Sequence, residues 1–458
     1  MCLCQSRKIV SAGDSRSYKS YTLSNYRNIE QIARLSEDQK FAIDVVARVL
    51  PFKTNNYVVN ELIDWDNVPD DPVFILNFPQ KGMLIPRHFD QMAKLVSSGA
   101  EKSEITACAN QIRLELNPHS AGQMEHNRPL LNGKVLSGMQ HKYKETVLCF
   151  PSQGQTCHAY CTFCFRWPQF IGVEELRFAM QEAEQLVQYL KVHPEVTDVI
   201  LTGGDPLIMR TKAISAYLRK LITADLPHLK TIRIGTKALT YWPQRFINDS
   251  DSDDLLHLFD EVAAAGKHLA IMAHFNAPQE LETEVVRNAI CRIRSTGAVI
   301  RTQSPLLRHI NDKAESWISL WKKQVNLGCV PYYMFVVRDT GAHHYFGVPL
   351  ARAWKIYRAA YKQVSGIART VRGPSMSAMP GKVQVLGVSE VRGEKVFVLQ
   401  MLQGRNPQWV AQPFFAAFDG QSTWLDELQP AFDEDRFFFE DELDHLQGRN
   451  ISPVSAVN

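Results

Sequence analysis

Short apolar runs alternate with amphipathic segments from about residue 140 onward. Apolar residues at helical spacing indicate helices, and short apolar runs bounded by turn residues indicate buried strands. A repeated order of strand and helix is typical of a parallel sheet. The pattern predicts strands at 145–150, 198–201, 231–235, 269–273, 299–302 and 330–336. It predicts helices at 173–192, 212–224, 253–264, 280–295 and 314–325.

These units predict an α/β fold, a partial (β/α)6 TIM barrel, in which the chemistry would lie at the carboxyl ends of the strands. Three regions are expected along the chain. They are a mostly helical N-terminal region at 1–135, the barrel at 136–390, and a small C-terminal extension at 391–458 that could serve docking or oligomerisation.

The two flanking regions carry weaker patterns. In the N-terminal region, 31–50 is a predicted helix that ends at a proline, and the proline-rich stretch 60–86 is a predicted irregular crossing. The extension carries a predicted strand at 395–402. Its acidic run at 433–444 is expected to be a solvated or docking face.

Composition narrows the classes of function. The 458 residues are 45% hydrophobic, and 51 Lys and Arg against 48 Asp and Glu give a formal charge of +3. This balance disfavours nucleic acid or an anionic membrane as a partner. No apolar run approaches the ~18 residues of a membrane span, and no signal peptide is evident, so a cytoplasmic location is expected. The nine cysteines, an odd number, fit a reducing compartment.

Three of these cysteines, Cys157, Cys161 and Cys164, have the spacing C-x₃-C-x₂-C. Three thiolates on a short loop can hold three irons of a [4Fe–4S] cluster and leave the fourth iron open. A structural zinc site is the alternative, but zinc usually takes a second pair of ligands, which the sequence lacks. A disulfide is a weaker alternative, since three cysteines cannot pair among themselves. The spacing therefore favours the cluster.

The spacing, with Phe163 before the last cysteine, resembles the signature of radical S-adenosylmethionine (SAM) enzymes. In that superfamily the open iron binds SAM, which is cleaved to a radical that takes hydrogen from the substrate. Two glycines and a carboxylate, Gly203, Gly204 and Asp205, follow the second predicted strand. By this resemblance Asp205 holds the amino group of SAM.

Further segments resemble the lysine 2,3-aminomutase family, whose members move an amino group between adjacent carbons with pyridoxal 5′-phosphate (PLP). The resemblance runs from about 69 to 388 and implies a radical SAM partial barrel. The matching segments are 138–143, 233–237, 243–245, 274–276, 303–307, 310–312, 331–333, 365–369 and 380–383.

The resemblance assigns roles to individual residues. Lys382, expected at the end of a strand, matches the lysine that forms the Schiff base with PLP. Arg166 matches an arginine beside the substrate and cofactor, and its guanidinium suits a carboxylate. His274 and Gln303 are cofactor-binding candidates. Lys142 and Tyr143 fall in the phosphate-binding stretch.

Departures from the family concern both PLP and the substrate. Thr146 stands where a second phosphate-binding arginine is usual, and the family's run of glycines before Lys382 is missing. The family's zinc-binding cysteines after that lysine are also absent, so the usual mode of assembly cannot be assumed. The two aspartates that read the lysine ammonium fall on Arg338 and Ser375. An arginine there would repel lysine and pair with a carboxylate.

Two features leave the role of Arg338 open. A one-residue bulge would place Asp339 in the site instead, although the spacing of the segment argues against it. Arg338 could also form an ordinary salt bridge outside the site.

The sequence therefore predicts a 2,3-aminomutase whose substrate is a glutamate-like or neutral amino acid rather than lysine. The alternative is a PLP-independent radical SAM enzyme acting on another small molecule or on an amino-acid residue in a larger partner. Other expected partners are an electron donor such as a flavodoxin or ferredoxin and a second copy of the chain.

Overall fold

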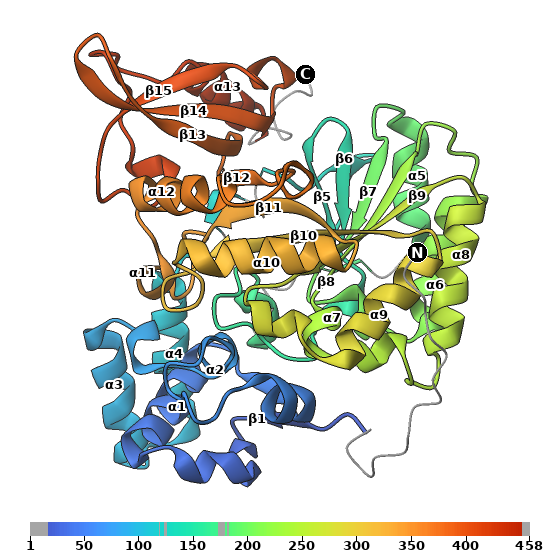
Figure 1. Cartoon of the computed structure of the whole chain (residues 1–458). Helices are drawn as coiled ribbons and strands as arrows, with labels where there is room; N and C mark the ends of the chain where they lie inside the picture. Colours follow the sequence, from blue (N-terminus) through green and yellow to red (C-terminus); the bar gives the residue numbers. More distant parts are fainter. Residues whose placement is uncertain (1–16, 119, 123–125, 173–178, 181–182, 451–458) are drawn as a thin grey trace.

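Seven parallel strands in chain order form the centre of the protein (Figure 1). The computed structural model describes residues 17–118, 120–122, 126–172, 179–180 and 183–450. The parallel strands are β6 (Thr146–Cys149), β7 (Asp198–Leu201), β8 (Thr231–Thr236), β9 (His268–His274), β10 (Val299–Leu306), β11 (Val330–Val336) and β12 (Arg372–Ser377). The six predicted strands are β6 to β11, and β12 was not predicted.

Antiparallel strands extend the sheet at both ends. They are β5 (Met139–Tyr143) beside β6, and β13 (Gly381–Val391), β14 (Glu394–Gly404) and β15 (Pro413–Ala417) beyond β12. Hydrogen-bonded pairing among the described strands ends at β5 and β15, so this mixed α/β sheet is not closed into a full barrel.

Among the described residues, one helix of ten or more residues lies between each of β6 to β11 and the next parallel strand. These helices are α5 (Ala183–Val192), α6 (Thr211–Thr223), α8 (Ser252–Ala264), α9 (Glu284–Ser295), α10 (Ala314–Asn326) and α12 (Leu350–Tyr361). Five of these helices match predicted helices. Most of the first ten residues of the predicted helix 173–192, at 173–182, lie outside the described residues. Helix α12 was not predicted.

The two faces of the sheet differ because side chains alternate along a strand. On β8, Ile232 and Ile234 are fully buried in the apolar core formed with the crossover helices. Arg233 and Gly235 point to the opposite face. The same alternation places Asp198 and His274 on that polar face, which is where the cavities of the protein lie.

The N-terminal region is largely helical. Its helices are α1 (Glu37–Val49), α2 (Pro72–Asn77), α3 (Pro86–Ser97) and α4 (Lys102–Glu115), with a π-helical turn at Val58–Leu62 and 3₁₀ turns at Tyr26–Asn28, Glu30–Arg34 and Lys81–Met83. Its strands are β1 (Ser20–Thr22), β2 (Lys53–Asn55), β3 (Leu130–Leu131) and β4 (Lys134–Val135).

Two predictions in this region need correction. The predicted helix 31–50 becomes α-helical only at Glu37, because Ser36 caps its N-terminus: the Ser36 side chain accepts from the backbone of Gln39. The stretch 60–86 is not wholly irregular. It contains α2, whose N-terminus is capped by Asp71, 2.7 Å from the backbone nitrogen of Phe74.

The last part of the chain packs as an apolar cluster on β13–β15. The predicted strand 395–402 lies within β14, and the acidic run overlaps α13 (Glu440–Asn450). The remaining short helices are α7 (Ala238–Tyr241), α11 (His343–Phe346) and 3₁₀ turns at Ser120–Gly122, Ser152–Gly154, Trp167–Phe170, Pro206–Ile208, Pro243–Phe246, Pro278–Leu281, Gly366–Ala368, Pro407–Trp409 and Leu425–Glu427. None of the described helices has the length and apolar character needed to span a bilayer.

The crossover helices should stabilise the fold through the apolar side chains on their buried faces. Phe259 on α8 is fully buried in the main core. Phe259→Ala should lower the free energy of unfolding by about 3–5 kcal/mol, because it removes apolar contacts and leaves a cavity. Urea denaturation measures this. The exposed neighbour Asp260 is the matched control, and Asp260→Ala should change stability by less than about 0.5 kcal/mol.

Candidate active site

The cysteine loop follows β6 and lies against the N-terminal region. Cys157, Cys161 and Cys164 line a cavity of about 270 Å³. The loop has little regular structure, so its backbone groups bond elsewhere: the Tyr160 N–H donates to the Lys53 carbonyl at 2.8 Å. The Thr162 N–H donates to the Leu76 carbonyl at 3.0 Å. Segments about a hundred residues earlier in the chain therefore fix the conformation of the loop.

The glycine pair after β7 packs directly on the start of this loop. A Cβ atom on Gly204 would lie 2.5 Å from the Thr156 carbonyl oxygen and 2.6 Å from the Thr156 nitrogen. Only glycine allows so close an approach of two backbones. Gly203 has φ of 140°, a conformation that L side chains rarely adopt. The cysteine loop and the Gly203–Asp205 segment, which are separate motifs in the sequence, therefore pack directly against each other.

Asp205 lines the cavity, but protein donors already occupy its carboxylate. Its oxygens accept from the Thr236 hydroxyl at 2.7 and 2.9 Å and from the backbone N–H groups of Lys237 at 2.8 Å and Leu207 at 3.0 Å. Burial raises the pKa of Asp205 to about 6, although these hydrogen bonds act to lower it. An ammonium group bound here would share the acceptors with the protein.

The opposite wall of the cavity carries His274 and Gln303. The Gln303 amide nitrogen lies 2.7 Å from His274 Nε2. Burial lowers the pKa of His274 to about 3, so the imidazole is neutral and accepts this hydrogen bond. Lys237 lines the same cavity and is paired with the fully buried Glu280 at 2.9 Å. Its charge is therefore neutralised within the protein.

The three thiols of the cysteine loop lie within electrostatic reach of one another. Burial raises the pKa of Cys164 to about 12 and also raises that of Cys157, so the thiols need a cation to become ligands. Among the described residues, no group of three His, Cys, Asp or Glu side chains is arranged around one ion position. The Tyr241 hydroxyl lies 3.3 Å from Cys161 Sγ, within the reach of a hydrogen bond to the sulfur.

A buried arginine, Arg166, and a half-buried one, Arg338, face the same cavity. Arg166 stacks on Phe150, with 4.1 Å between guanidinium and ring centroid, and Arg338 stacks on Phe165 at 5.0 Å. Among the described residues neither forms a salt bridge. Nε and one terminal nitrogen of Arg166, and Nε of Arg338, are buried without a hydrogen-bond partner. Buried donors without acceptors are costly, so the cavity favours an anionic group.

The structure separates the residues predicted to select the substrate. Arg338 lines the cavity, whereas Asp339 does not and instead accepts from the Asn117 amide at 3.1 Å. Ser375 is fully buried, and its hydroxyl lies 3.5 Å from the Met334 carbonyl. Ser375 does not line the cavity, so the structure gives no support for its predicted contact with substrate. Ser377, two residues later, does line it.

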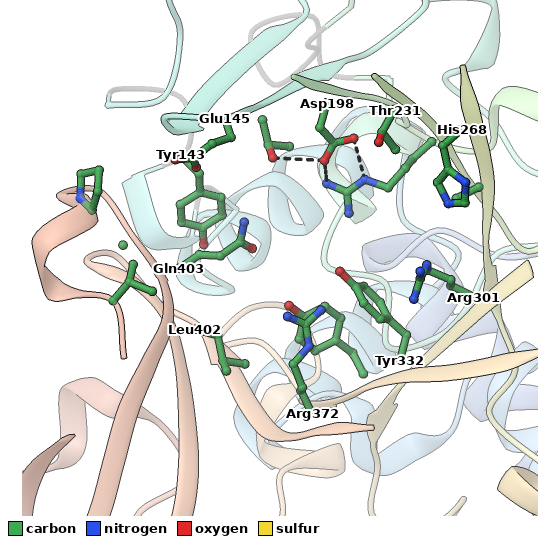
Figure 2. A pocket seen from close by; sticks show the side chains of 17 residues that line it. Tyr143, Glu145, Asp198, Thr231, His268, Arg301, Tyr332, Arg372, Leu402 and Gln403 are labelled. Atoms are coloured by element: carbon green, nitrogen blue, oxygen red, sulfur yellow. Dashed lines mark hydrogen bonds and ion pairs between the residues drawn. The ribbon is translucent and has the colours of Figure 1, made fainter. Parts of the chain in front are cut away.

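A second cavity of about 610 Å³ opens at the amino ends of the strands (Figure 2). Its wall carries the ion pair of Asp198 and Arg233, with 2.9 Å from Arg233 Nε to the carboxylate. Figure 2 shows Tyr332 between Arg301 and Arg372 across from this pair. The two guanidinium carbons lie 5.2 and 4.4 Å from the Tyr332 ring centroid.

Lys382 lies between the two cavities. Its amine donates to Gln403 Oε1 at 3.2 Å and lies 4.2 Å from the ring centroid of Tyr333; both residues line the second cavity. Phe335, which lines the cysteine cavity, lies 5.5 Å away. Lys382 is the second residue of β13, so the prediction that it ends a strand was wrong. The tight β12–β13 turn brings it back over the polar face.

Burial and neighbouring cations set the charge of this amine. They lower the pKa of Lys382 to about 7, with burial the main cause and Arg233 and Arg372 adding to it. A lysine that is about half neutral near pH 7 can act as a nucleophile. Its position and pKa are what attack on an aldehyde requires.

Lys142 and Tyr143, at the end of β5, lie beside the turn that leads to Lys382. The Lys142 amine donates to the Ala378 carbonyl. Burial lowers the pKa of Lys142 well below its usual range, and the charges of Arg405, Arg338 and Lys382 lower it further. Tyr143 lines the second cavity. Both residues are therefore placed where an anion beside Lys382 would lie.

Similarity to known proteins identifies the family of this chain. No family model matches the chain. A putative L-lysine 2,3-aminomutase from Aquifex aeolicus (strain VF5) is 30% identical over 363 residues, which cover 79% of this chain and 84% of the relative. The chain belongs to the radical SAM lysine 2,3-aminomutase family.

Other members of the lysine 2,3-aminomutase family match shorter stretches. L-lysine 2,3-aminomutase from Escherichia coli (strain K12) is 28% identical over 244 residues, covering 52% of this chain and 67% of the relative. A solved radical SAM methyltransferase from Sphaerobacter thermophilus covers 61% of this chain and 91% of its own length at 13% identity. Its TM-score of 0.36 is too low to define the fold.

Two interactions near the site were not predicted from the sequence: the Tyr241 hydroxyl beside Cys161, and the charge of Arg405 near Lys142. Tyr241 lies four residues after a matching segment, but nothing in the sequence indicates its contact with Cys161. Arg405 belongs to the C-terminal extension, where no family motif was found. Neither contact has a local signal, because each joins residues about 80 or more positions apart.

The lowered pKa of Lys382 has a measurable consequence. Reductive methylation by formaldehyde needs the neutral amine. Its rate at Lys382 should therefore rise with pH, reach half its maximum near pH 7 and level off above it. Peptide mass spectrometry between pH 6 and 9 measures this. Exposed lysines should still be gaining rate at pH 9, because an ordinary lysine has a pKa of about 10.4. A Lys382 rate that follows them would contradict the assignment.

Proposed function

We propose that this chain is a radical SAM, PLP-dependent 2,3-aminomutase acting on an amino acid with a glutamate-like or neutral side chain. The observation that carries the proposal is the buried Lys382 amine, which contacts residues of both cavities. An amine in this position can hold a carbonyl cofactor on one side of the polar face while the reacting atoms face the cysteine loop. The open, sequentially ordered sheet supports a partial (β/α)6 barrel as the scaffold.

The residues of the cysteine cavity fit the expected cofactors. Cys157, Cys161 and Cys164 would hold the [4Fe–4S] cluster, and the loop of Gly203 to Asp205 with His274 and Gln303 would bind SAM. When bound, the cluster and SAM supply a hydrogen-abstracting radical, and PLP supplies a conjugated ring beside the migrating nitrogen. Reduction of the cluster calls for an electron donor of the flavodoxin or ferredoxin class.

The preference for an acidic substrate rests on Arg166 and Arg338. Both guanidinium groups are buried in the cysteine cavity with unused N–H donors. An amino acid offers one carboxylate, and a glutamate-like substrate offers a second, which would satisfy both arginines. A lysine substrate would place its ammonium group near Arg338, where the charges repel.

A direct test of the PLP assignment is covalent attachment. Borohydride reduction of the PLP-loaded protein should fix the cofactor on the peptide that contains Lys382, because its amine combines a lowered pKa with contacts to residues of both cavities. Peptide mass spectrometry measures the modification. Lys382→Ala should lose it, while Lys94→Ala, a change on the outer helix α3, should retain it.

The competing hypothesis is a PLP-independent radical SAM enzyme. It is favoured by Thr146, whose hydroxyl lies 3.2 Å from the Asp198 carboxylate, an anion close to where phosphate would bind. Unmodified Lys382 in the wild type, together with turnover by protein stripped of PLP, would establish this alternative.

The substrate preference is tested by an amino-acid panel assayed with SAM, reductant and PLP. The wild type should turn over glutamate or neutral amino acids in preference to lysine. Arg338→Asp should lower kcat/KM for glutamate by about 100-fold, the effect of replacing an attraction by a repulsion in a buried pair. The same change should raise activity on lysine.

Arg338→Gln is the matched control. It removes the charge without reversing it, so glutamate activity should fall by a smaller factor and lysine should gain little. Turnover of lysine alone by the wild type would refute the substrate preference while leaving the aminomutase assignment intact.

A further inference from the structure

The turn that connects β12 to β13 lies between two cations from distant parts of the chain. On one side the Lys142 amine of β5 donates to the Ala378 carbonyl. On the other, Arg405 follows β14 directly. Its backbone N–H donates to the Pro380 carbonyl at 3.0 Å, and its Nε donates to the Met379 carbonyl at 2.9 Å. Lys142 thus contacts Ala378, and Arg405 contacts Met379 and Pro380. These three residues lead directly to Gly381 and Lys382.

Arg405 is held in place without being neutralised. One terminal nitrogen donates to Asn127 Oδ1 at 2.7 Å, and the other donates to the His126 carbonyl at 3.3 Å. All of these acceptors are uncharged. Among the described residues, no carboxylate forms a salt bridge with Arg405, Lys142 or Lys382. The guanidinium is thus fixed by neutral contacts and keeps its full positive charge.

The surroundings of Lys142 are also cationic. The charges that act on it come from Arg405, Arg338 and Lys382, and each disfavours its protonated form. Tyr143, the next residue, is close to the charges of Arg405 and Arg338. Buried cations that repel one another destabilise the protein unless an anion lies between them. The arrangement calls for a ligand that carries more than one negative charge.

The second cavity lies next to these cations. Tyr143, Gln403 and Gly404 line it, and Figure 2 shows Tyr143 and Gln403 side by side on its wall. Gln403 accepts from the Lys382 amine, and Arg405 lies two residues after Gln403. A ligand attached to Lys382 and lying along this wall would bring its far end to the Lys142 and Arg405 side of Tyr143.

The position beside Tyr143 where the family has its second cation carries a threonine in this chain. Thr146, which stands where the family has an arginine, lies 3.2 Å from the Asp198 carboxylate. Asp198 is paired with Arg233. The Asp198 carboxylate is thus already paired, whereas Lys142 and Arg405 pair with no carboxylate among the residues that the structure describes.

We propose that Arg405 supplies the second cation of a phosphate-binding site formed with Lys142 and the Tyr143 hydroxyl, and that this site holds the phosphate of PLP. The inference rests on the proposed function, since it assumes that PLP is bound at Lys382. It assigns the C-terminal extension a direct part in cofactor binding.

The test compares PLP with pyridoxal, which has the same aldehyde but no phosphate. Arg405→Met removes the charge and keeps an unbranched side chain. It should raise the Kd for PLP by about 10- to 100-fold, the usual effect of losing a charge-assisted hydrogen bond. The Kd for pyridoxal should stay within about twofold. Both are measured by the absorbance change on binding to the purified full-length protein.

Two further variants separate a loss of charge from a loss of fold. Arg405→Gln retains donors for the neighbouring carbonyl groups and should show the same selective loss of PLP affinity. Arg392→Met, an exposed arginine in the turn at the far end of the β13–β14 hairpin, is the matched control and should bind both compounds like the wild type.

The outcomes are distinct. An unchanged Kd for PLP in Arg405→Met and Arg405→Gln, or an equal loss for PLP and pyridoxal, would overturn the role of Arg405 while leaving Lys382 attachment intact. A wild type that captures no PLP at Lys382 would overturn the proposed function and this inference together.

Discussion

The site depends on where the backbone N–H and C=O groups of the cysteine loop find their hydrogen-bond partners. The eight residues of this loop carry three cysteines and form no β-ladder of their own. Its backbone groups bond instead to β2 and α2, and Lys53 also donates its side-chain amine to the Cys157 carbonyl at 2.8 Å. Gly204 lets the next loop pack on it at backbone distance. Unpaired buried backbone groups are costly, so these contacts fix the position of the thiols. The N-terminal region is thus part of the site's support.

Charge on the polar face of the sheet divides into two kinds. Asp198 with Arg233 and Glu280 with Lys237 are ion pairs complete within the protein. Arg166 and Arg338 near the cysteines, and Lys142 and Arg405 near Lys382, have no such partner among the described residues. Paired charges hold strands and loops together, whereas unpaired buried cations destabilise the protein until an anion binds. The distribution explains why the proposed ligands are a carboxylate substrate and a phosphorylated cofactor.

The fold was largely predictable where an element is encoded by residues close together in the sequence. Each of β6 to β11 corresponds to a short apolar run in the sequence, and burial alternates with a period of two along β7 and β8. The prediction missed β12, where Gly373, Pro374 and two serines hide the pattern, and α12, whose segment carried no recognised start. The helix predicted at 31–50 was too long, because the capping by Ser36, and not the apolar spacing, sets where it begins.

The sequence alone predicted a cluster-binding cysteine loop from residue type and spacing within eight positions, and the resemblance to a known family singled out Gly203–Asp205 and Lys382. Tertiary structure decided which side chains meet. It placed Arg338 in the cavity and Ser375 outside it, brought Tyr241 to Cys161, and set Arg405 beside Lys142, 263 positions earlier in the chain. Such encounters depend on the register and curvature of strands that are far apart in the chain, and no local pattern encodes them.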